Sequence, residues 1–309
     1  MGVEITNSNA NSLLNLPFED LVAKANKVRK EFLGNKLELC SILNAKSGMC
    51  REDCKFCAQS AKNATKVPTY PLKKREEIIA AAKNAKAIGA EKFGIVTSGN
   101  RLTSKEIDTL SEVISKIKNE IGITVCASLG ALKAEEFKIL TRAGLSRYHH
   151  NIETSERFYP NIVTTHNFQE RINTISAAKK AGLQVCSGGI IGMGESFQDR
   201  IDMACLLRDL EVDSVPLNIL VPIKGTCFGD QKTISCVDVI KTICIFRIIL
   251  QDKVIKIAAG RETALKDFQA LGFMAGANGM LIGGYLTIKG REIDADYKLI
   301  EEIKKLWSE

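Results

Sequence analysis

Eight short β-rich runs alternate with amphipathic helical stretches, and this alternation constrains the fold more than any other feature of the chain. The runs span residues 37–43, 92–98, 123–129, 147–153, 183–190, 213–220, 254–260 and 279–285. Several of the helical patterns end on Gly, a common helix terminator. Eight such units within 309 residues predict a (β/α)8 barrel, with a doubly wound open sheet as the alternative. We expect a helical extension over residues 1–35 and the barrel over 36–309.

The composition narrows the class of protein. Charged residues make up 26% of the chain, and the net charge of +7 is spread without blocks, so we expect no nucleic-acid partner. No apolar run approaches the length of about 18 residues that a membrane helix needs, and the N-terminus lacks the pattern of a signal peptide. We therefore expect a cytoplasmic protein with no membrane partner. Its ten cysteines should then be reduced, as metal ligands or buried apolar residues.

Three of these cysteines are close together in CREDCKFC, residues 50–57, with the spacing C-x3-C-x2-C. The segment follows the first β-rich run, and a barrel would place it at the C-terminal end of that strand, where barrel active sites lie. A structural zinc site usually has four N or S ligands, and no fourth Cys or His is near in the sequence. Three thiolates on an iron–sulfur cluster instead leave one iron open. A zinc-binding structural or nucleic-acid module remains the alternative.

This spacing, with an aromatic residue before the last cysteine, resembles the cysteine loop of the radical SAM superfamily. The resemblance implies a 4Fe–4S cluster whose open iron binds S-adenosylmethionine, which one electron cleaves to methionine and a 5′-deoxyadenosyl radical. The cluster ligands would be Cys50, Cys54 and Cys57. Phe56 would lie near the adenine. The segment GGIIGMGE, residues 188–195, resembles the glycine-rich stretch after the fifth strand in this superfamily, and Ile190 would touch the adenine. Glycines there would let the backbone approach a ligand closely.

Segments from about residue 37 to 290 resemble the biotin synthases in order, including RYHHNIETSERFYPNIVTTHNFQERINTI, DSVPLNILVPIKGT, AAGRE and FMAGAN. The resemblance implies abstraction of hydrogen from C9 and then C6 of dethiobiotin, followed by insertion of sulfur to give biotin. It places around S-adenosylmethionine the residues Tyr148, His150, Asn151, Glu153 and, facing its carboxylate, Arg171. Asn151 and Asn218 would lie near the ureido ring, which suits amides because each has both a donor and an acceptor.

In that family a 2Fe–2S cluster, held by three cysteines and an arginine, supplies the sulfur. Cys126, Cys186 and Arg261 match three of these four positions. The second-strand position is Gly94, which cannot bind iron. We hypothesise an altered auxiliary cluster held by Cys40, Cys126 and Cys186 with Arg261 nearby, since a thiolate is a good iron ligand. The alternative is that Cys40 only packs and that there is no second cluster.

Other interpretations stay open on the sequence alone. Cys227 lies on a loop after the sixth strand, where an active-site role is possible. The same barrel could serve lipoyl-synthase-like sulfur insertion on an octanoylated carrier protein. It could also serve radical chemistry without sulfur insertion, for which the loss of a ligand at Gly94 is the best support. The resemblance also implies a flavodoxin or ferredoxin as electron donor and a homodimer.

Overall fold

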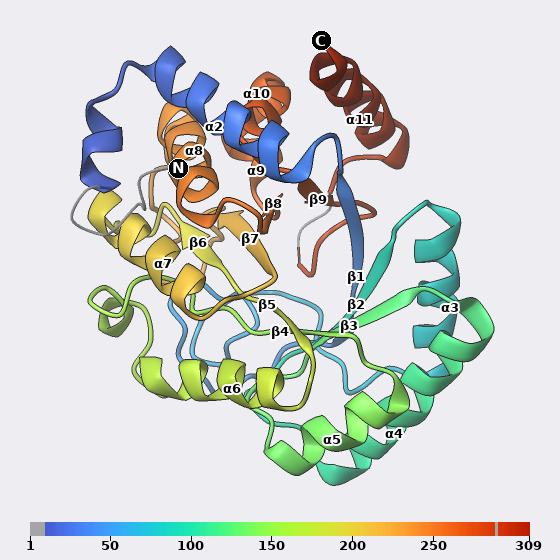
Figure 1. Cartoon of the computed structure of the whole chain (residues 1–309). Helices are drawn as coiled ribbons and strands as arrows, with labels where there is room; N and C mark the ends of the chain where they lie inside the picture. The colour runs from blue at the N-terminus through green and yellow to red at the C-terminus, as the bar shows by residue number, and fades with distance from the viewer. Residues whose placement is uncertain (1–9, 288–289) are drawn as a thin grey trace.

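The computed structural model describes residues 10–287 and 290–309, and a closed barrel of parallel strands forms its centre (Figure 1). The sheet order is β5-β4-β3-β2-β1-β9-β8-β7-β6, and a further pairing of β5 with β7 closes the ring. The strands are β1 (Glu38–Lys46), β2 (Lys92–Thr97), β3 (Thr124–Ser128), β4 (Arg147–His149), β5 (Gln184–Cys186), β6 (Gly189–Ile191), β7 (Ser214–Ile219), β8 (Val254–Ile257) and β9 (Gly279–Leu281). β5 and β6 are two halves of one barrel position, so the predicted (β/α)8 barrel is confirmed.

Helices surround this barrel and connect its strands. They are α3 (Arg75–Ala87), α4 (Ser104–Lys116), α5 (Ala134–Ala143), α6 (Phe168–Lys180), α7 (Phe197–Asp209), α8 (Cys236–Leu250), α9 (Arg261–Leu265), α10 (Gln269–Met274) and α11 (Ile293–Ser308), with short turns η2 (Ile117–Ile121), η3 (Tyr159–Asn161) and η4 (Lys266–Phe268). Local sequence starts several of them. In α6, for example, the Asn167 side chain accepts from the Glu170 backbone N–H, and the Glu170 side chain accepts from that of Asn167.

The N-terminal segment packs on the outside of the barrel. Within the described residues it holds η1 (Asn11–Asn15) and α2 (Phe18–Leu33), and α2 lies against α8 (Figure 1). Leu21 and Ala25 of α2 are fully buried. α8 is apolar on nearly all sides because α2 covers the face turned away from the barrel. The boundary predicted at residue 35 stays a prediction, and residues 1–9 lie outside the described part.

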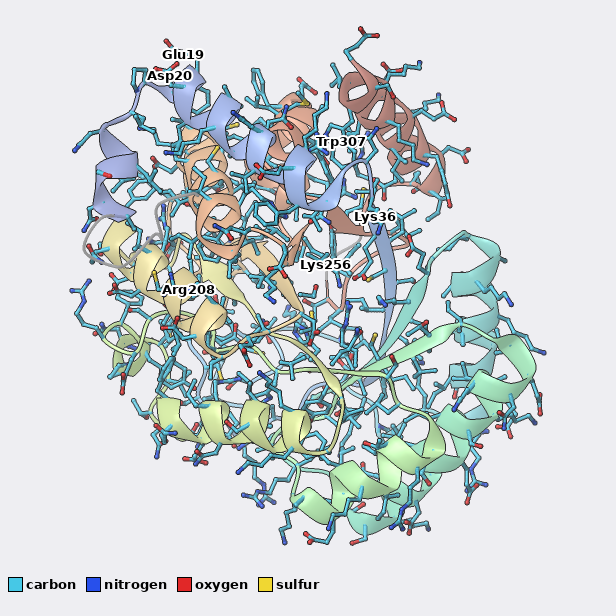
Figure 2. All side chains as sticks on the ribbon, viewed as in Figure 1. Glu19, Asp20, Lys36, Arg208, Lys256 and Trp307 are labelled. Atoms are coloured by element: carbon cyan, nitrogen blue, oxygen red, sulfur yellow. The ribbon has the colours of Figure 1, made fainter. Side chains whose placement is uncertain are left out.

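Side chains alternate along the strands and fill the interior of the barrel. Lys256 of β8 is one of them and lies inside the ring of strands (Figure 2). In the described residues, no helix combines the length and the apolar character needed to cross a membrane.

Candidate active site

A cavity of about 370 Å3 runs through the barrel interior. Phe56 and Cys57 of the cysteine loop line one end. The far end is lined by the side chains of Cys40, Cys126, Cys186, Arg147 and Lys256. One thiol of the loop, Cys57, and the thiols carried by strands therefore line one cavity, although they are distant in the sequence.

The cysteine loop is held by hydrogen bonds to its own backbone. The Asn63 side-chain amide donates to the carbonyl oxygens of Cys54 and Cys57, over 3.1 and 2.9 Å. The Cys50 N–H donates to the Gln59 carbonyl oxygen over 3.1 Å. Burial raises the pKa of the Cys57 thiol to about 11 and raises that of Cys54 further. A metal that replaces these protons offsets the cost of burying thiolates, so the loop fits an iron cluster.

One wall of the cavity carries polar residues that the sequence singled out. Asn151, Glu153 and Asn218 line it, together with the apolar side chain of Ile190. The Asn151 amide donates to a Glu153 carboxylate oxygen over 3.2 Å and accepts from the Gly188 N–H over 3.1 Å. Glu153 has a φ of 70°, a left-handed conformation that costs energy for a residue with a side chain. Backbone strain of this kind clusters at functional sites.

Two predicted residues of this wall face the other way. Tyr148 is fully buried outside the cavity, where its hydroxyl donates to the Gly130 carbonyl oxygen and its ring packs edge-on against Phe137 of α5. His150 shares that orientation, and its ring stacks near Tyr148. The period-two alternation of β4 is the reason, since it turns Arg147, His149 and Asn151 inward. His149, which the sequence analysis did not select, lines the cavity.

Arg171 lies behind this wall. It does not line the cavity, but its guanidinium donates to the Asn151 carbonyl oxygen over 2.9 Å and lies 3.8 Å from a Glu153 carboxylate oxygen. Burial would lower the pKa of Arg171, yet the charge of Glu153 raises it above its usual value. The cation is thus held beside the two residues that do face the cavity.

The glycine-rich segment is packed closely against neighbouring backbone. A Cβ on Gly188 would lie 2.0 Å from the Pro216 carbonyl oxygen, and one on Gly189 would lie 2.2 Å from the Glu153 carbonyl oxygen. These glycines permit close approach of the neighbouring backbone at Pro216 and Glu153. Glu195 ends the segment, and its carboxylate accepts from the backbone N–H of Gly192.

Charged groups surround the thiols at the far end of the cavity. The Glu38 carboxylate contacts Lys256 Nζ at 2.7 Å and Arg147 Nη1 at 2.7 Å. Burial raises the pKa of Cys40 to about 12 and that of Cys126 to about 11. Burial acts the same way on Cys186, but the positive charge of Lys256, with help from His149 and Arg147, lowers its pKa to about 6. A thiolate is therefore favoured there before any metal binds.

Arg261 is not among these groups. It is the first residue of α9, and its guanidinium donates to Asp296 Oδ1 over 2.7 Å and to Gln269 Oε1 over 2.6 Å. The cation beside the thiols is Lys256, five residues earlier and inside β8. A lysine in the apolar run VIKI was the available signal, because a buried lysine needs a partner.

Gly94 and Cys227 occupy contrasting positions. Gly94 lines the cavity and is paired in register with both Ile42 and Cys126. A Cβ there would lie 3.1 Å from Ile42 Cγ2. The Ile42 side chain therefore occupies space next to the position where a ligand at residue 94 would lie. Cys227 is exposed, does not line the cavity, and lies with its sulfur 3.8 Å from Asn63 Oδ1.

Neither group of thiols is arranged around one metal ion. Among residues 10–287 and 290–309, no three Cys, His, Asp or Glu side chains are close enough to hold a single ion. A zinc ion draws all its ligands to within about 2.3 Å of one point. A cluster of several irons takes its thiolates at separate atoms, so thiols spaced around a volume suit it better.

Comparison with known proteins agrees with the fold. The Radical SAM superfamily model matches residues 46–207, and the Biotin and Thiamin Synthesis associated domain matches residues 216–304. Solved structures of similar fold include a methylornithine synthase, with a TM-score of 0.84, 21% identity and coverage of 98% of this chain and 94% of that one. Another is an FeFe-hydrogenase maturase from Carboxydothermus hydrogenoformans, with a TM-score of 0.83, 19% identity and coverage of 97% and 75%. At these identities the likeness concerns the fold alone.

Similarity in sequence is more specific. A biotin synthase of Thermotoga petrophila is 52% identical over 95% of this chain and 97% of its own length. One of Thermotoga neapolitana is 55% identical over 88% of this chain and 98% of its own length. The chain therefore belongs to the biotin synthases of the radical SAM superfamily.

Proposed function

We propose that this chain converts dethiobiotin to biotin by radical insertion of sulfur. The observation that carries the proposal is the single cavity that joins the cysteine loop to a second group of thiols, with amide side chains between them. A radical generator and a sulfur donor must both reach one substrate, and this cavity gives both access. As a radical SAM enzyme, the chain uses a 4Fe–4S cluster and S-adenosylmethionine.

At the loop end, Cys50, Cys54 and Cys57 would hold the 4Fe–4S cluster. When bound, that cluster supplies the electron that cleaves S-adenosylmethionine. Phe56 and Ile190 line the same end of the cavity and are suited to contact the adenine. Asn151 and Glu153 offer amide and carboxylate oxygens to the amino group of S-adenosylmethionine, and Arg171 places a positive charge behind them for its carboxylate.

In the middle of the cavity, two amides suit the ureido ring of dethiobiotin. Asn218 donates to the Gly189 carbonyl oxygen and accepts from the Ala259 N–H, both over 3.3 Å. Each contact is long, and the amide keeps a second N–H and a second lone pair for a substrate. Asn151 has the same capacity. Apolar side chains such as Ile190 and Val221 would exclude water around the reacting carbons.

At the far end, Cys40, Cys126 and Cys186 would hold the auxiliary cluster that donates sulfur, with Lys256 in the place expected for Arg261. The alternation of β1 and β3 turns Cys40 and Cys126 into the cavity. Lys256 keeps Cys186 as a thiolate, the form that binds iron.

The reaction also implies partners outside the chain. Cleavage of S-adenosylmethionine needs a low-potential electron, so we propose a flavodoxin or ferredoxin as donor. We place the enzyme in the cytoplasm, where thiols stay reduced, and propose a homodimer.

The test is one anaerobic assay. Reconstituted protein that carries both clusters is mixed with S-adenosylmethionine, a low-potential reductant and dethiobiotin, and products are identified by mass spectrometry. Biotin together with 5′-deoxyadenosine is the expected result. If 5′-deoxyadenosine forms without biotin, the enzyme acts on another substrate, as in lipoyl-synthase-like insertion or radical chemistry without sulfur.

A further inference from the structure

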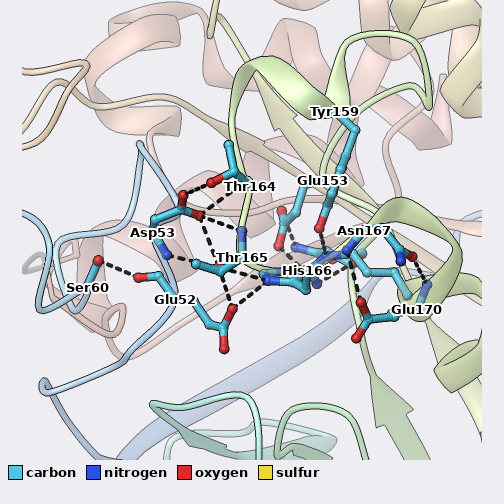
Figure 3. A network of polar contacts seen from close by, with 12 residues as sticks. Glu52, Asp53, Ser60, Glu153, Tyr159, Thr164, Thr165, His166, Asn167 and Glu170 are labelled. Atoms are coloured by element: carbon cyan, nitrogen blue, oxygen red, sulfur yellow. Dashed lines mark hydrogen bonds and ion pairs between the residues drawn. The ribbon is translucent and has the colours of Figure 1, made fainter.

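A buried histidine outside the sites described above joins the cysteine loop to the polar wall of the cavity (Figure 3). His166 is 8% exposed. Its Nδ1 lies 2.7 Å from a Glu52 carboxylate oxygen, and its Nε2 lies 3.0 Å from Nη2 of Arg171. Glu52 is between the first two cysteines of the loop, and Arg171 lies behind Asn151 and Glu153.

The two contacts determine which ring nitrogen of His166 carries the proton. A guanidinium has N–H donors and no acceptor, so Nε2 must accept from Arg171. Nδ1 must then carry the hydrogen and donate it to Glu52, whose carboxylate accepts. Nδ1 thus donates to the Glu52 carboxylate, and Nε2 accepts from the Arg171 guanidinium on the other side of the ring.

The loop end of this connection is fastened at several further points. Thr165 Oγ1 donates to the Glu52 carboxylate over 2.5 Å. The Asp53 carboxylate accepts from the backbone N–H groups of Thr164 and Thr165, over 2.9 and 3.2 Å. Removal of the His166 contact alone would therefore leave the loop attached to residues 164–165.

The Arg171 end depends more on His166. Arg171 Nε donates to the Tyr159 hydroxyl over 2.7 Å, and Nη1 donates to the Asn151 carbonyl oxygen over 2.9 Å. In the described part of the chain, the hydrogen-bond acceptor found for Nη2 is His166. Without it, the guanidinium could rotate about its remaining contacts and change its distance from Glu153.

We propose that His166 is a positioning residue for the binding of S-adenosylmethionine. Through Nδ1–H it holds Glu52 and the loop, and through Nε2 it orients Arg171 behind the wall that faces the open iron. The inference rests on the proposed function only in that the bound molecule is S-adenosylmethionine. The dominant contribution comes from Nε2, because the loop has other attachments, whereas no other acceptor for Arg171 Nη2 is found among the described residues.

Two substitutions separate the two nitrogens. The amide of His166→Asn reaches the position of Nδ1, so it can still donate to Glu52 but does not reach Arg171. The longer His166→Gln brings its amide oxygen to the position of Nε2, where it can accept from Arg171. Gln169→Ala, on the exposed face of α6, is the matched control within the same segment.

The affinity for S-adenosylmethionine is measured by equilibrium dialysis of reconstituted protein, with iron and sulfide determined for each variant. We expect His166→Asn to raise the dissociation constant roughly tenfold, the usual effect of losing a hydrogen bond to a charged group. His166→Gln should stay within about threefold of the parent protein, since its acceptor is retained. The change that S-adenosylmethionine causes in the EPR spectrum of the reduced cluster should be weakened in the Asn variant and restored in the Gln variant.

Three outcomes would overturn the inference. They are an unchanged affinity in His166→Asn, equal losses in both variants, or a larger loss in His166→Gln. Equal losses would assign His166 to packing alone. None of these outcomes depends on dethiobiotin, so failure of the inference would be distinguishable from failure of the parent protein to form biotin.

Discussion

The two groups of thiols in this barrel are built in opposite ways. Cys50, Cys54 and Cys57 lie within eight consecutive residues, and nearby backbone contacts shape their loop. The second group comes from three separate strands, so closure of the barrel is what brings it together. Burial raises the pKa of the Cys54 and Cys57 thiols in the loop, whereas the charge of Lys256 offsets the effect of burial on the pKa of Cys186. The loop thiols therefore depend on bound metal to balance the negative charge of their thiolates. At the strand thiols, Lys256 already balances part of that charge.

Loss of a loop thiol should have the largest effect. Cys54→Ser removes a ligand that no neighbouring residue replaces, so we expect the 4Fe–4S cluster to be absent and cleavage of S-adenosylmethionine to be undetectable. Iron and sulfide analysis and the yield of 5′-deoxyadenosine measure this. Cys236→Ser, at the start of α8, is the control and should retain both. A Cys54→Ser protein that still cleaves S-adenosylmethionine would remove the loop from the proposal.

Removal of the Lys256 charge beside Cys186 should impair the strand thiols without affecting the loop thiols. In Lys256→Met the thiolate loses its main favourable neighbour, and we expect auxiliary iron and biotin formation to fall by at least about tenfold. Cleavage of S-adenosylmethionine should continue, because the loop is untouched. Lys256→Arg keeps the charge and should retain most auxiliary iron. Equal effects of Met and Arg would show that shape rather than charge matters at this position.

Loss of Cys40 tests the altered ligand set. Cys40→Ser keeps the size of the side chain but offers a poorer iron ligand, so we expect auxiliary iron to fall several-fold while the 4Fe–4S cluster is retained. Anaerobic iron analysis and biotin formation measure this result. Full auxiliary iron with full turnover would mean that Cys40 only packs.

The difference between the two groups also explains what the sequence could and could not predict. The β-rich runs and the C-x3-C-x2-C spacing are local patterns, and they led to the barrel and to a loop that lines its cavity. The orientation of side chains depends on strand register, which is harder to predict from local sequence patterns. Tyr148 and His150 were expected beside a bound ligand but do not line the cavity, because alternation along the chain turns Arg147, His149 and Asn151 inward instead. Tyr148 packs against Phe137 of α5, and His150 lies beside Tyr148.

The charges at the dispersed site were harder still to predict. Arg261 was expected beside the thiols because AAGRE resembles the family's arginine motif, and Lys256, which lies within β8, was not considered. His166 was missed because one of its two partners, Glu52, is far in the sequence from both His166 and Arg171. Such contacts exist only once the barrel has closed.

The smallest expected effect concerns Gly94, where the missing ligand can be restored. A Cβ there would lie 3.1 Å from Ile42 Cγ2, so Ile42 must move by a few tenths of an ångström. Because a side chain in a strand also reduces the entropy of the unfolded chain, we expect Gly94→Cys to change the free energy of unfolding by no more than about 1 kcal/mol, measured by urea denaturation. In the double variant Cys40→Ser/Gly94→Cys, the new thiol faces the same cavity and should restore auxiliary iron. Restoration would show that Cys40 supplies the ligand that Gly94 lacks, whereas no restoration, with folding intact, would mean that the two positions do not serve the same cluster.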